Sequence, residues 1–423
     1  MIYQRMFVCF SSIFVFFMTA SAEDWPQFRG PGGSGISATT GLPLTWSSTN
    51  NLVWKSPIPG YGASSPIVIG DKVFVTCYSG YGLDRDNPGE QKKMMLHVIC
   101  YARTNGEVVW SKSLAPQLPD QGYSQFLPEH GYASSTPASD GLAIYVFFGR
   151  SGVWAFDLDG NKLWHANVGS NTHIFGTAAS PLLVDNHLII NASVENDNLL
   201  AFDKTTGVEV WRANGIKDAW NTPTLVNLPD GGKEVVVTIA EQILGFDPQN
   251  GNRLWSCESA GSYICPSVVA DNGTVYVIAG RGPYVAGIRA GGRGDVTETH
   301  RLWVTKESSN VPSPVYHNGH LYWVNEVGVA HCLNAETGET VYKQRVDGAE
   351  KTYASALFAD GRLYVVTWLS GTFVLDASTE FKILARNMLS GDDSIFNGSP
   401  AVSGNQLFLR SNKFLYCLGK QDN

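Results

Sequence analysis

The sequence predicts an all-β protein, an eight-bladed β-propeller built from four-stranded antiparallel blades. Three observations predict this fold class, and the first is composition. Aromatic residues make up 12% of the 423 residues and there are 44 glycines, but only 16% of the residues are charged. Many strand-forming aromatics with many turn residues and few charges are typical of an all-β protein. The other two observations are patterns that each occur eight times, as expected for a repeat architecture.

The first pattern is a Ser/Thr-Pro step, an apolar strand, a turn containing Gly, Asp or Asn, and a second strand rich in β-branched and aromatic residues. We expect these to be the inner strands of each blade. The eight copies begin at Ser65-Pro66, Thr136-Pro137, Ser180-Pro181, Thr222-Pro223, Cys265-Pro266, Ser313-Pro314, Ser355-Ala356 and Ser399-Pro400.

The second pattern is a short strand, a turn containing glycine, and a strand that carries a tryptophan. Three clear copies run from Ala155 to Trp164, from Ala201 to Trp211 and from Gly245 to Trp255. The same place is held by Trp54, Trp110 and Trp303, and by degenerate copies at Tyr342 and near Leu384. Two strands from each pattern make four strands per repeat, which is the content of one propeller blade.

The phase of the two patterns predicts how the ring closes. The first tryptophan strand, at 52–55, precedes the first Ser-Pro step, and the last inner half, at 399–418, is followed by no tryptophan strand. We therefore expect the N-terminal strand to complete the eighth blade and remove the free sheet edges. The predicted organisation is a single propeller domain at 50–423, preceded by an extended segment at 23–49.

The N-terminus has the pattern of a signal peptide. Arg5 precedes an apolar run from Phe7 to Met18, and Ala20-Ser21-Ala22 supplies the small residues of a cleavage site. This run is too short to span a bilayer, which takes about 20 residues. We predict cleavage after Ala22 and a periplasmic or secreted protein with no transmembrane segment; a buried N-terminal strand is the alternative.

The charge balance disfavours a nucleic-acid partner. The 38 acidic residues outnumber the 30 basic ones, which gives a formal net charge of −8. Binding to nucleic acid usually needs a basic surface.

The repeats resemble a known family. The spacing Ala-x-Asp-x-x-x-Gly-x-x-x-Trp is similar to the tryptophan-docking motif of pyrroloquinoline-quinone (PQQ)-like propellers, and the resemblance covers essentially all of 50–420. The stretches at 24–31 (DWPQFRGP) and 291–297 (GGRGDVT) resemble an exported bacterial group of this family. The resemblance implies a tryptophan-docked propeller, but the same fold carries both quinone dehydrogenases and scaffolds of the BamB type.

The resemblance also bears on the cofactor. A dehydrogenase of this family is expected to have two adjacent cysteines over PQQ, a Ca²⁺ held by Glu, Asn and Asp, an Asp base and a longer chain. No two cysteines are adjacent here. The resemblance therefore implies a scaffold without a cofactor, and PQQ with Ca²⁺ is the alternative.

The mouth of the central channel is one candidate site. Aromatic and polar residues stand three positions before the proline of several Ser/Thr-Pro steps, and charged residues follow the second strand at comparable positions. The first set is Trp220, Tyr263, Tyr353 and Asn397, and the second is Arg150, Glu195, Glu241, Arg281, Glu326 and Trp368. Blade symmetry predicts that the two arginines and three glutamates share one rim. Such a ring could hold a planar anion or a peptide strand, or be a water-filled hole with paired charges.

The long loops of the first repeat are the other candidate site. The loops at 78–95 and 111–133 leave the same face of a propeller, and long loops on a rigid scaffold often carry function. The predicted contact residues there are Asp84, Arg85, Asp86, Tyr123, Glu129 and His130, with His173 in the next loop. The alternative is ordinary solvated loop charge.

Two cysteines could form a disulfide. Cys257 and Cys265 lie eight positions apart in a chain predicted to be exported, where disulfides are common. Packing as small apolar groups is the alternative for both.

Together these patterns predict a monomeric, exported, non-catalytic propeller that binds a protein or polymer partner of the cell envelope through its long-loop face and channel mouth. The first alternative is a PQQ-dependent or quinone-binding oxidoreductase. A sugar-active or other hydrolase is the third possibility.

Overall fold

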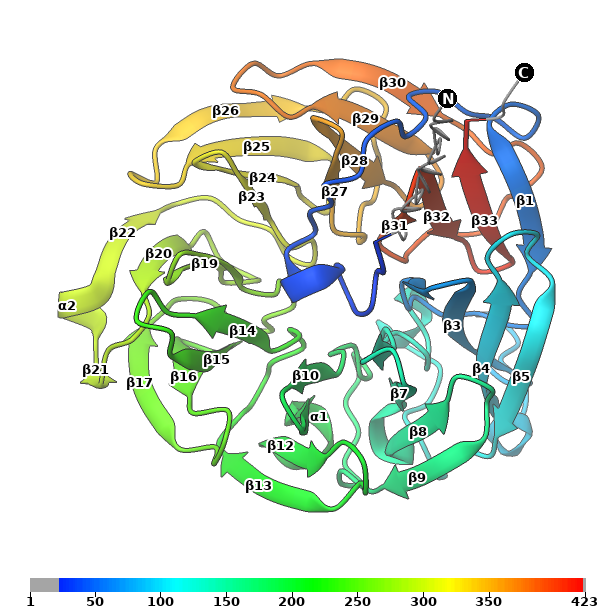
Figure 1. The fold of residues 1–423 in the computed structure, drawn as a ribbon, viewed down its shortest axis with the longest axis horizontal. Coiled ribbons are helices and arrows are strands. Elements are labelled where there is room, and N and C mark those ends of the chain that lie inside the picture. The colour runs from blue at the N-terminus through cyan, green and yellow to red at the C-terminus, as the bar shows by residue number, and fades with distance from the viewer. Residues whose placement is uncertain (1–22, 421–423) are drawn as a thin grey trace, which may run out of the picture.

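Eight β-sheets are arranged around a central axis like the blades of a propeller (Figure 1). The computed structural model describes residues 23–420, so the predicted signal peptide at 1–22 lies outside the described residues. Seven of the sheets have four strands and one has five. All pairs within each four-stranded blade are antiparallel, for example β2–β3, β3–β4 and β4–β5 of the first blade. The predicted fold class is confirmed.

In seven blades the strands run in chain order from the axis outward, and in the last blade β1 supplies the outer strand. The innermost strands are β2 (Ile67–Ile69), β6 (Ala138–Ser139), β10 (Leu182–Val184), β14 (Thr224–Asn227), β18 (Val269–Asp271), β23 (Val315–His317), β27 (Leu357–Ala359) and β31 (Ala401–Ser403). The second strands are β3 (Lys72–Ser79), β7 (Ala143–Phe147), β11 (His187–Ala192), β15 (Lys233–Ile239), β19 (Thr274–Ile278), β24 (His320–Val324), β28 (Arg362–Val366) and β32 (Gln406–Arg410).

The third strands are β4 (Met95–Ala102), β8 (Val153–Asp157), β12 (Asn198–Asp203), β16 (Gln242–Phe246), β20 (Val285–Arg289), β25 (Val329–Asn334), β29 (Thr372–Asp376) and β33 (Phe414–Gly419). The outer strands are β5 (Val108–Leu114), β9 (Lys162–Ala166), β13 (Glu209–Asn214), β17 (Arg253–Glu258), β22 (Arg301–Thr305), β26 (Thr340–Arg345), β30 (Ile383–Asn387) and β1 (Leu52–Pro57). The short helices are η1 (Pro31–Gly33), η2 (Gln91–Lys93), η3 (Leu127–Glu129), η4 (Gly149–Ser151), α1 (Ser193–Asn196) and α2 (Thr297–His300).

The outer strand of the last blade comes from the other end of the chain. β1 pairs antiparallel with β33, with Trp54 opposite Cys417, and the sheet order is β1-β33-β32-β31. The backbone N–H of Gly419 also donates to the carbonyl of Asn51 at 3.0 Å. The two ends of the propeller are thus joined within one sheet.

Tryptophans of the outer strands contact the neighbouring blade. Each packs opposite a small residue of its own third strand, as Trp110 does opposite Cys100 and Trp211 opposite Ala201. Five indole N–H groups donate, at 2.8 to 3.1 Å, to carbonyls in the next blade: Trp54 to Arg103, Trp110 to Leu158, Trp164 to Lys204, Trp211 to Pro248 and Trp303 to Ala335. These buried or half-buried indoles therefore fill the space between sheets while their polar N–H is satisfied.

Trp255 departs from this pattern because the next blade has an insertion. The loop between β20 and β22 contributes a fifth strand, β21 (Gly294–Asp295), which pairs in parallel with β17. The indole N–H of Trp255 donates to the buried carboxylate of Glu234 at 2.7 Å, and Arg293 of the inserted loop donates to the same carboxylate at 3.0 Å. The 291–297 stretch therefore covers one outer blade edge.

The N-terminal segment crosses the axis on one face of the ring, where it appears in blue at the centre of Figure 1. Its backbone pairs with the inner strands of the first and seventh blades: Trp25 with Val68 at 2.9 Å, and Gly35 with Phe358 at 2.8 Å. Trp25 is buried against the propeller. The segment therefore closes the channel from the face opposite the long loops.

Candidate functional site

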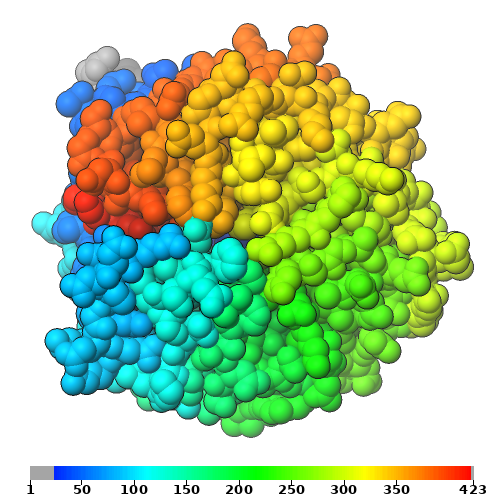
Figure 2. All heavy atoms as spheres, turned by 180° about the vertical axis from the view of Figure 1, so that it is seen from behind, coloured from blue at the N-terminus to red at the C-terminus, as the bar shows by residue number. Residues whose placement is uncertain are grey.

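A cavity of about 320 Å³ lies on the propeller axis. Its lining comes from the loops that enter the inner strands of all eight blades, and Phe28 of the N-terminal segment contributes from the other face. Figure 2 shows the long-loop face, where the cyan segment of the first repeat reaches the centre of the molecule. A cavity closed on one side and covered by loops on the other is suited to a small ligand, since small-molecule sites are concave and largely enclosed.

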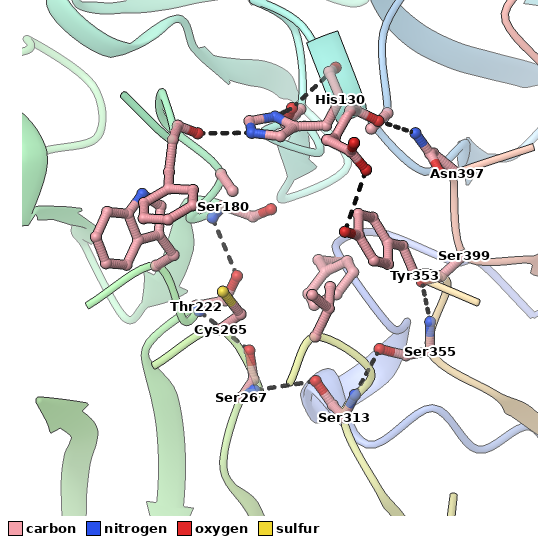
Figure 3. A pocket seen from close by; sticks show the side chains of 18 of the residues that line it. His130, Ser180, Thr222, Cys265, Ser267, Ser313, Tyr353, Ser355, Asn397 and Ser399 are labelled. Atoms are coloured by element: carbon pink, nitrogen blue, oxygen red, sulfur yellow. Dashed lines mark hydrogen bonds between the residues drawn. The ribbon is translucent and has the colours of Figure 1, made fainter. Parts of the chain in front are cut away.

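Eight hydroxyl side chains form a closed ring of hydrogen bonds around this cavity. Each oxygen accepts the backbone N–H of the corresponding residue in the preceding blade, at 2.8 to 3.0 Å. In order around the axis, the ring members are Ser65, Thr136, Ser180, Thr222, Ser267, Ser313, Ser355 and Ser399, and Ser399 donates back to Ser65. Figure 3 shows the arc from Ser180 to Ser399. Because each hydroxyl uses a lone pair in the ring, its own proton can be donated to a group in the cavity.

The fifth member of this ring corrects the predicted repeat. The sequence pattern placed Cys265-Pro266 in register with the Ser/Thr-Pro steps, but Ser267 occupies the ring position. The loop before β18 is therefore two residues out of phase with the simple motif. Cys265 instead takes the place that lies two residues before each ring hydroxyl.

The residues two positions before the ring hydroxyls form a second layer that lines the cavity. They are Ala63, Ser134, Ala178, Trp220, Cys265, Val311, Tyr353 and Asn397. Trp220, Tyr353 and Asn397 were predicted from their position, and all three face the cavity. Tyr263 also lines it, from two residues before Cys265. A residue's position relative to the start of the innermost strand thus predicts whether it lines the cavity, even in the fifth blade, where the motif is displaced by two residues.

One wall is aromatic and carries a single arginine. The guanidinium of Arg281 lies 5.0 Å from the ring centre of Tyr263 and 5.2 Å from that of Phe175. Trp220 stacks on Tyr263 with 5.9 Å between ring centres. No carboxylate pairs with Arg281 among residues 23–420. This side chain offers a positive charge held on aromatic faces, with no acidic side chain to neutralise it.

The other charged groups at the mouth are paired with one another. Glu129 forms an ion pair with Lys351, and it accepts a hydrogen bond from the Tyr353 hydroxyl at 3.3 Å. The Asn397 amide donates to the backbone carbonyl of Glu129 at 2.6 Å. Lys351 also lies 3.9 Å from the ring centre of Trp368. These contacts fasten the loop of the first repeat across the mouth to the seventh and eighth blades.

His130 stands on the same loop and contacts the third repeat. Its Nε2 lies 2.6 Å from the carbonyl oxygen of Phe175, and its Nδ1 is hydrogen-bonded to the Ser134 hydroxyl (Figure 3). Burial lowers the pKa of His130 below its usual value. Burial therefore favours the neutral form of the imidazole.

A small neighbouring cavity of about 20 Å³ holds a second charged group of residues. Arg150, Glu195, His173 and Asp120 line it. Glu195 is buried, accepts a hydrogen bond from Thr177, and has one carboxylate oxygen without a partner. Burial raises the pKa of Glu195 to about 7. Burial lowers the pKa of His173 and raises that of Asp120. A cavity of this size holds one water molecule.

The prediction that two arginines and three glutamates share one rim around the axis is wrong. Of these five residues, only Arg281 lines the axial cavity. Arg150 and Glu195 stand on short helices, η4 and α1, which direct them to the small cavity. Glu241 is exposed in a tight turn with φ of 63°. Glu326 accepts the backbone N–H of Asn310 at 2.8 Å. The loops after the second strands differ in conformation, so equal sequence position does not give equal radius.

The remaining long-loop residues lie away from the cavity. Asp84, Arg85 and Asp86 are exposed, and Asp84 caps its own turn by accepting the N–H of Asp86 at 2.9 Å. Tyr123 packs against Tyr81 and Tyr132 in an aromatic cluster under the loop. This cluster supports the loop that covers the mouth.

The predicted disulfide is not formed. Cys257 and Cys265 are both free thiols in the structure. Cys257 is buried on the outer strand β17, whereas Cys265 lines the axial cavity, and burial raises its pKa to about 12. Cys257 packs as a small buried group, which was the alternative interpretation, whereas Cys265 faces the cavity.

The sequence did not single out several cavity residues, among them Phe28, Phe126, Phe175 and Ser134. Ser134 could have been found from its place two residues before the Thr136 step. The aromatic residues stand in irregular loops, where no periodicity marks them. Within residues 23–420, no group of three or more His, Cys, Asp or Glu side chains is placed to hold a metal ion, and no helix is long and apolar enough to cross a membrane.

Sequence comparison places the chain in a family. The profile described as "outer membrane protein assembly factor BamB" matches residues 31–173, 94–326 and 294–392, which overlap and extend over most of the chain. The chain belongs to this BamB family. No curated protein matches the sequence.

Solved structures similar to this member of the BamB family include proteins with different names. BamB from Moraxella catarrhalis has a TM-score of 0.62 at 13% identity, and the match covers 88% of this chain and 98% of that one. A europium-containing methanol dehydrogenase has a TM-score of 0.62 at 11% identity, covering 94% and 98%. The computationally designed Ika8 protein has a TM-score of 0.56 at 11% identity, covering 87% and 99%. At such identities the likeness shows the fold alone.

Proposed function

We propose that this chain is a binding protein that takes a small planar organic anion into its axial cavity from the long-loop face. The observation that carries the proposal is Arg281, a cation in the cavity wall that rests on aromatic rings and has no acidic partner among the described residues. An arginine fork binds a carboxylate through two parallel hydrogen bonds, so an anionic ligand would supply the missing partner.

The rest of the lining supports the same class of ligand. Trp220, Tyr263 and Phe175 present ring faces on which a flat molecule can stack. The hydroxyl ring offers donors for carbonyl or carboxylate oxygens at the other side of the cavity. A cavity of about 320 Å³ falls at the small end of the range for ligand sites.

The quinone alternative can be tested against these residues. A planar tricarboxylate such as PQQ has the chemistry that Arg281 and the aromatic wall would accept. The donor set for Ca²⁺ fits less well, because the described residues contain no cluster of three or more metal-ligating side chains. PQQ therefore belongs among the test ligands, with and without Ca²⁺.

We also propose a location in the cell envelope and a class of partner. The N-terminal pattern at 1–22 supports an exported protein of the cell envelope, and we propose that it acts as a monomer. A second candidate function is a scaffold for a protein partner, which the match to the BamB family favours. Its contact surface would be the exposed loop residues Asp84, Arg85 and Asp86 rather than the cavity.

Isothermal titration calorimetry with a panel of aromatic carboxylates and PQQ tests the first proposal. At least one anion should bind the wild type, and Arg281→Gln should weaken it at least 10-fold without changing the melting temperature. Arg253→Gln, at an exposed position on β17, is the matched control and should bind normally. If no anion binds, or if Arg281→Gln binds as tightly as the wild type, the small-ligand proposal is wrong.

A further inference from the structure

Ser134 and His130 form a hydrogen-bonded pair on the wall of the axial cavity. Both side chains line it, and the Ser134 hydroxyl is hydrogen-bonded to Nδ1 of His130. Ser134 stands two residues before the ring hydroxyl of Thr136, in the register that faces the cavity. A cavity-facing hydroxyl in contact with an imidazole is the arrangement of an activated nucleophile.

The proton positions follow from the partners of the imidazole. The carbonyl oxygen of Phe175 can only accept, so Nε2 of His130 must carry the proton in that 2.6 Å contact. The Nδ1 atom of the neutral ring is then an acceptor, and Ser134 donates its proton to it. The hydroxyl also lies 3.2 Å from the His130 carbonyl, but its single proton goes to the shorter contact, with Nδ1. The ring is thereby fixed in the tautomer that a general base needs.

The base is also held in place. His130 follows the short helix η3, and its neighbour Glu129 is fastened to Lys351 and Asn397. The carbonyl of Phe175 fixes the far edge of the imidazole. A nucleophile, a base and a third group that orients the base are therefore joined by hydrogen bonds, with the third group supplied by a neighbouring loop.

We propose that Ser134 is a nucleophile and His130 its general base, and that the pair hydrolyses a carboxylic ester small enough to enter the axial cavity. Ser134 Oγ adds to the ester carbonyl carbon as its proton passes to Nδ1 of His130. The bond to the alcohol oxygen breaks, the alcohol leaves with that proton, and the acyl group remains on Ser134. A water molecule then adds to this acyl group, giving its proton to Nδ1, and the carboxylic acid is released as Ser134 regains its proton.

This inference uses the same cavity as the proposed function but does not depend on an anionic ligand. The test is therefore a neutral reagent, phenylmethanesulfonyl fluoride, which forms a sulfonate ester with an activated serine and releases fluoride. Intact mass and peptide mapping should find one adduct, on Ser134, in the full-length protein. Hydrolysis of 4-nitrophenyl acetate should exceed the buffer rate and be blocked by the adduct.

Three variants decide the outcome. Ser134→Ala should lose both the adduct and the ester hydrolysis, and His130→Gln should label at least 10-fold more slowly. Ser124→Ala, an exposed serine of the same loop, is the matched control and should behave as the wild type. The proposal is overturned if Ser134 carries no adduct, if Ser134→Ala still hydrolyses the ester, or if a folded His130→Gln labels at the wild-type rate. Labelling of Arg281→Gln at the wild-type rate would support the pair even if no anion binds.

Discussion

Replacing Thr222 by valine should break one link in the ring of eight hydroxyls. Thr222 accepts the backbone N–H of Ser180 at 3.0 Å, and Ser180 is buried. Valine has nearly the same shape and keeps the branched side chain, so the change removes the acceptor and leaves the packing in place. The N–H of Ser180 then has no partner, while the N–H of Thr222 still donates to Ser267.

The expected cost follows from that unpaired group. A buried donor without a partner costs about 1–3 kcal/mol of folding free energy. With an unfolding entropy of about 2.1 cal/mol/K per residue, a chain of about 400 residues loses about 1–4 °C in melting temperature. Differential scanning calorimetry of the purified protein measures this shift.

Thr205→Val is the matched control for the ring substitution, since Thr205 is exposed in the turn between β12 and β13. The control should shift the melting temperature by less than the ring variant. If both variants melt like the wild type, the ring does not stabilise the propeller and the reasoning about its shared hydrogen bonds is wrong.

Two further predictions concern closure and pH. Deletion of residues 23–57 removes β1, exposes the edge of β33 and unseals the channel, so the truncated protein should melt at a clearly lower temperature; equal melting would contradict closure through this strand. Because burial raises the folded-state pKa of Glu195 to about 7, above an unfolded value near 4.5, the folded state holds an extra proton between these values. Stability should therefore fall as pH rises from about 4.5 to 7, by up to about 3 kcal/mol. Glu195→Gln should remove this component, so its stability relative to the wild type should be higher at pH 8 than at pH 4; a constant difference across that range would show that Glu195 does not titrate in this way.

The fold could be predicted from the sequence because its signals repeat. Six of the eight outer strands carry a tryptophan, and most blades begin with a Ser/Thr-Pro step. The geometry of a four-stranded sheet sets the spacing of both signals, so a few degenerate copies do not hide the pattern. The small residue opposite each tryptophan, such as Cys100 or Ala201, follows from the same geometry. The shift from Cys265 to Ser267 was missed because the repeat was aligned on its proline, whereas the hydroxyl residue makes the hydrogen bond.

The site could be predicted where it follows the repeat and, for Glu129 and His130, from the length of the loop that carries them. Trp220, Tyr353 and Asn397 line the cavity because the inner register of each blade points there. Arg150, Glu195 and Glu241 lie elsewhere because each stands in a loop with its own backbone conformation. The hydrogen-bonded contact between His130 and Ser134 joins two residues of one irregular loop, and its orientation depends on Phe175 from another repeat. No regular spacing in the sequence predicts this three-residue contact.

The pairing of β1 with β33 has a kinetic consequence for the growing chain. About 360 residues separate the two strands, and at about 5–20 residues per second their synthesis takes about 20–70 s. During that interval β1 has no partner of its own, and after release the long loop must close at an entropic cost of about 5 kcal/mol. A second copy of the chain offers the same edge, so crowded refolding should yield dimers that have exchanged β1, and dilution before refolding should suppress them.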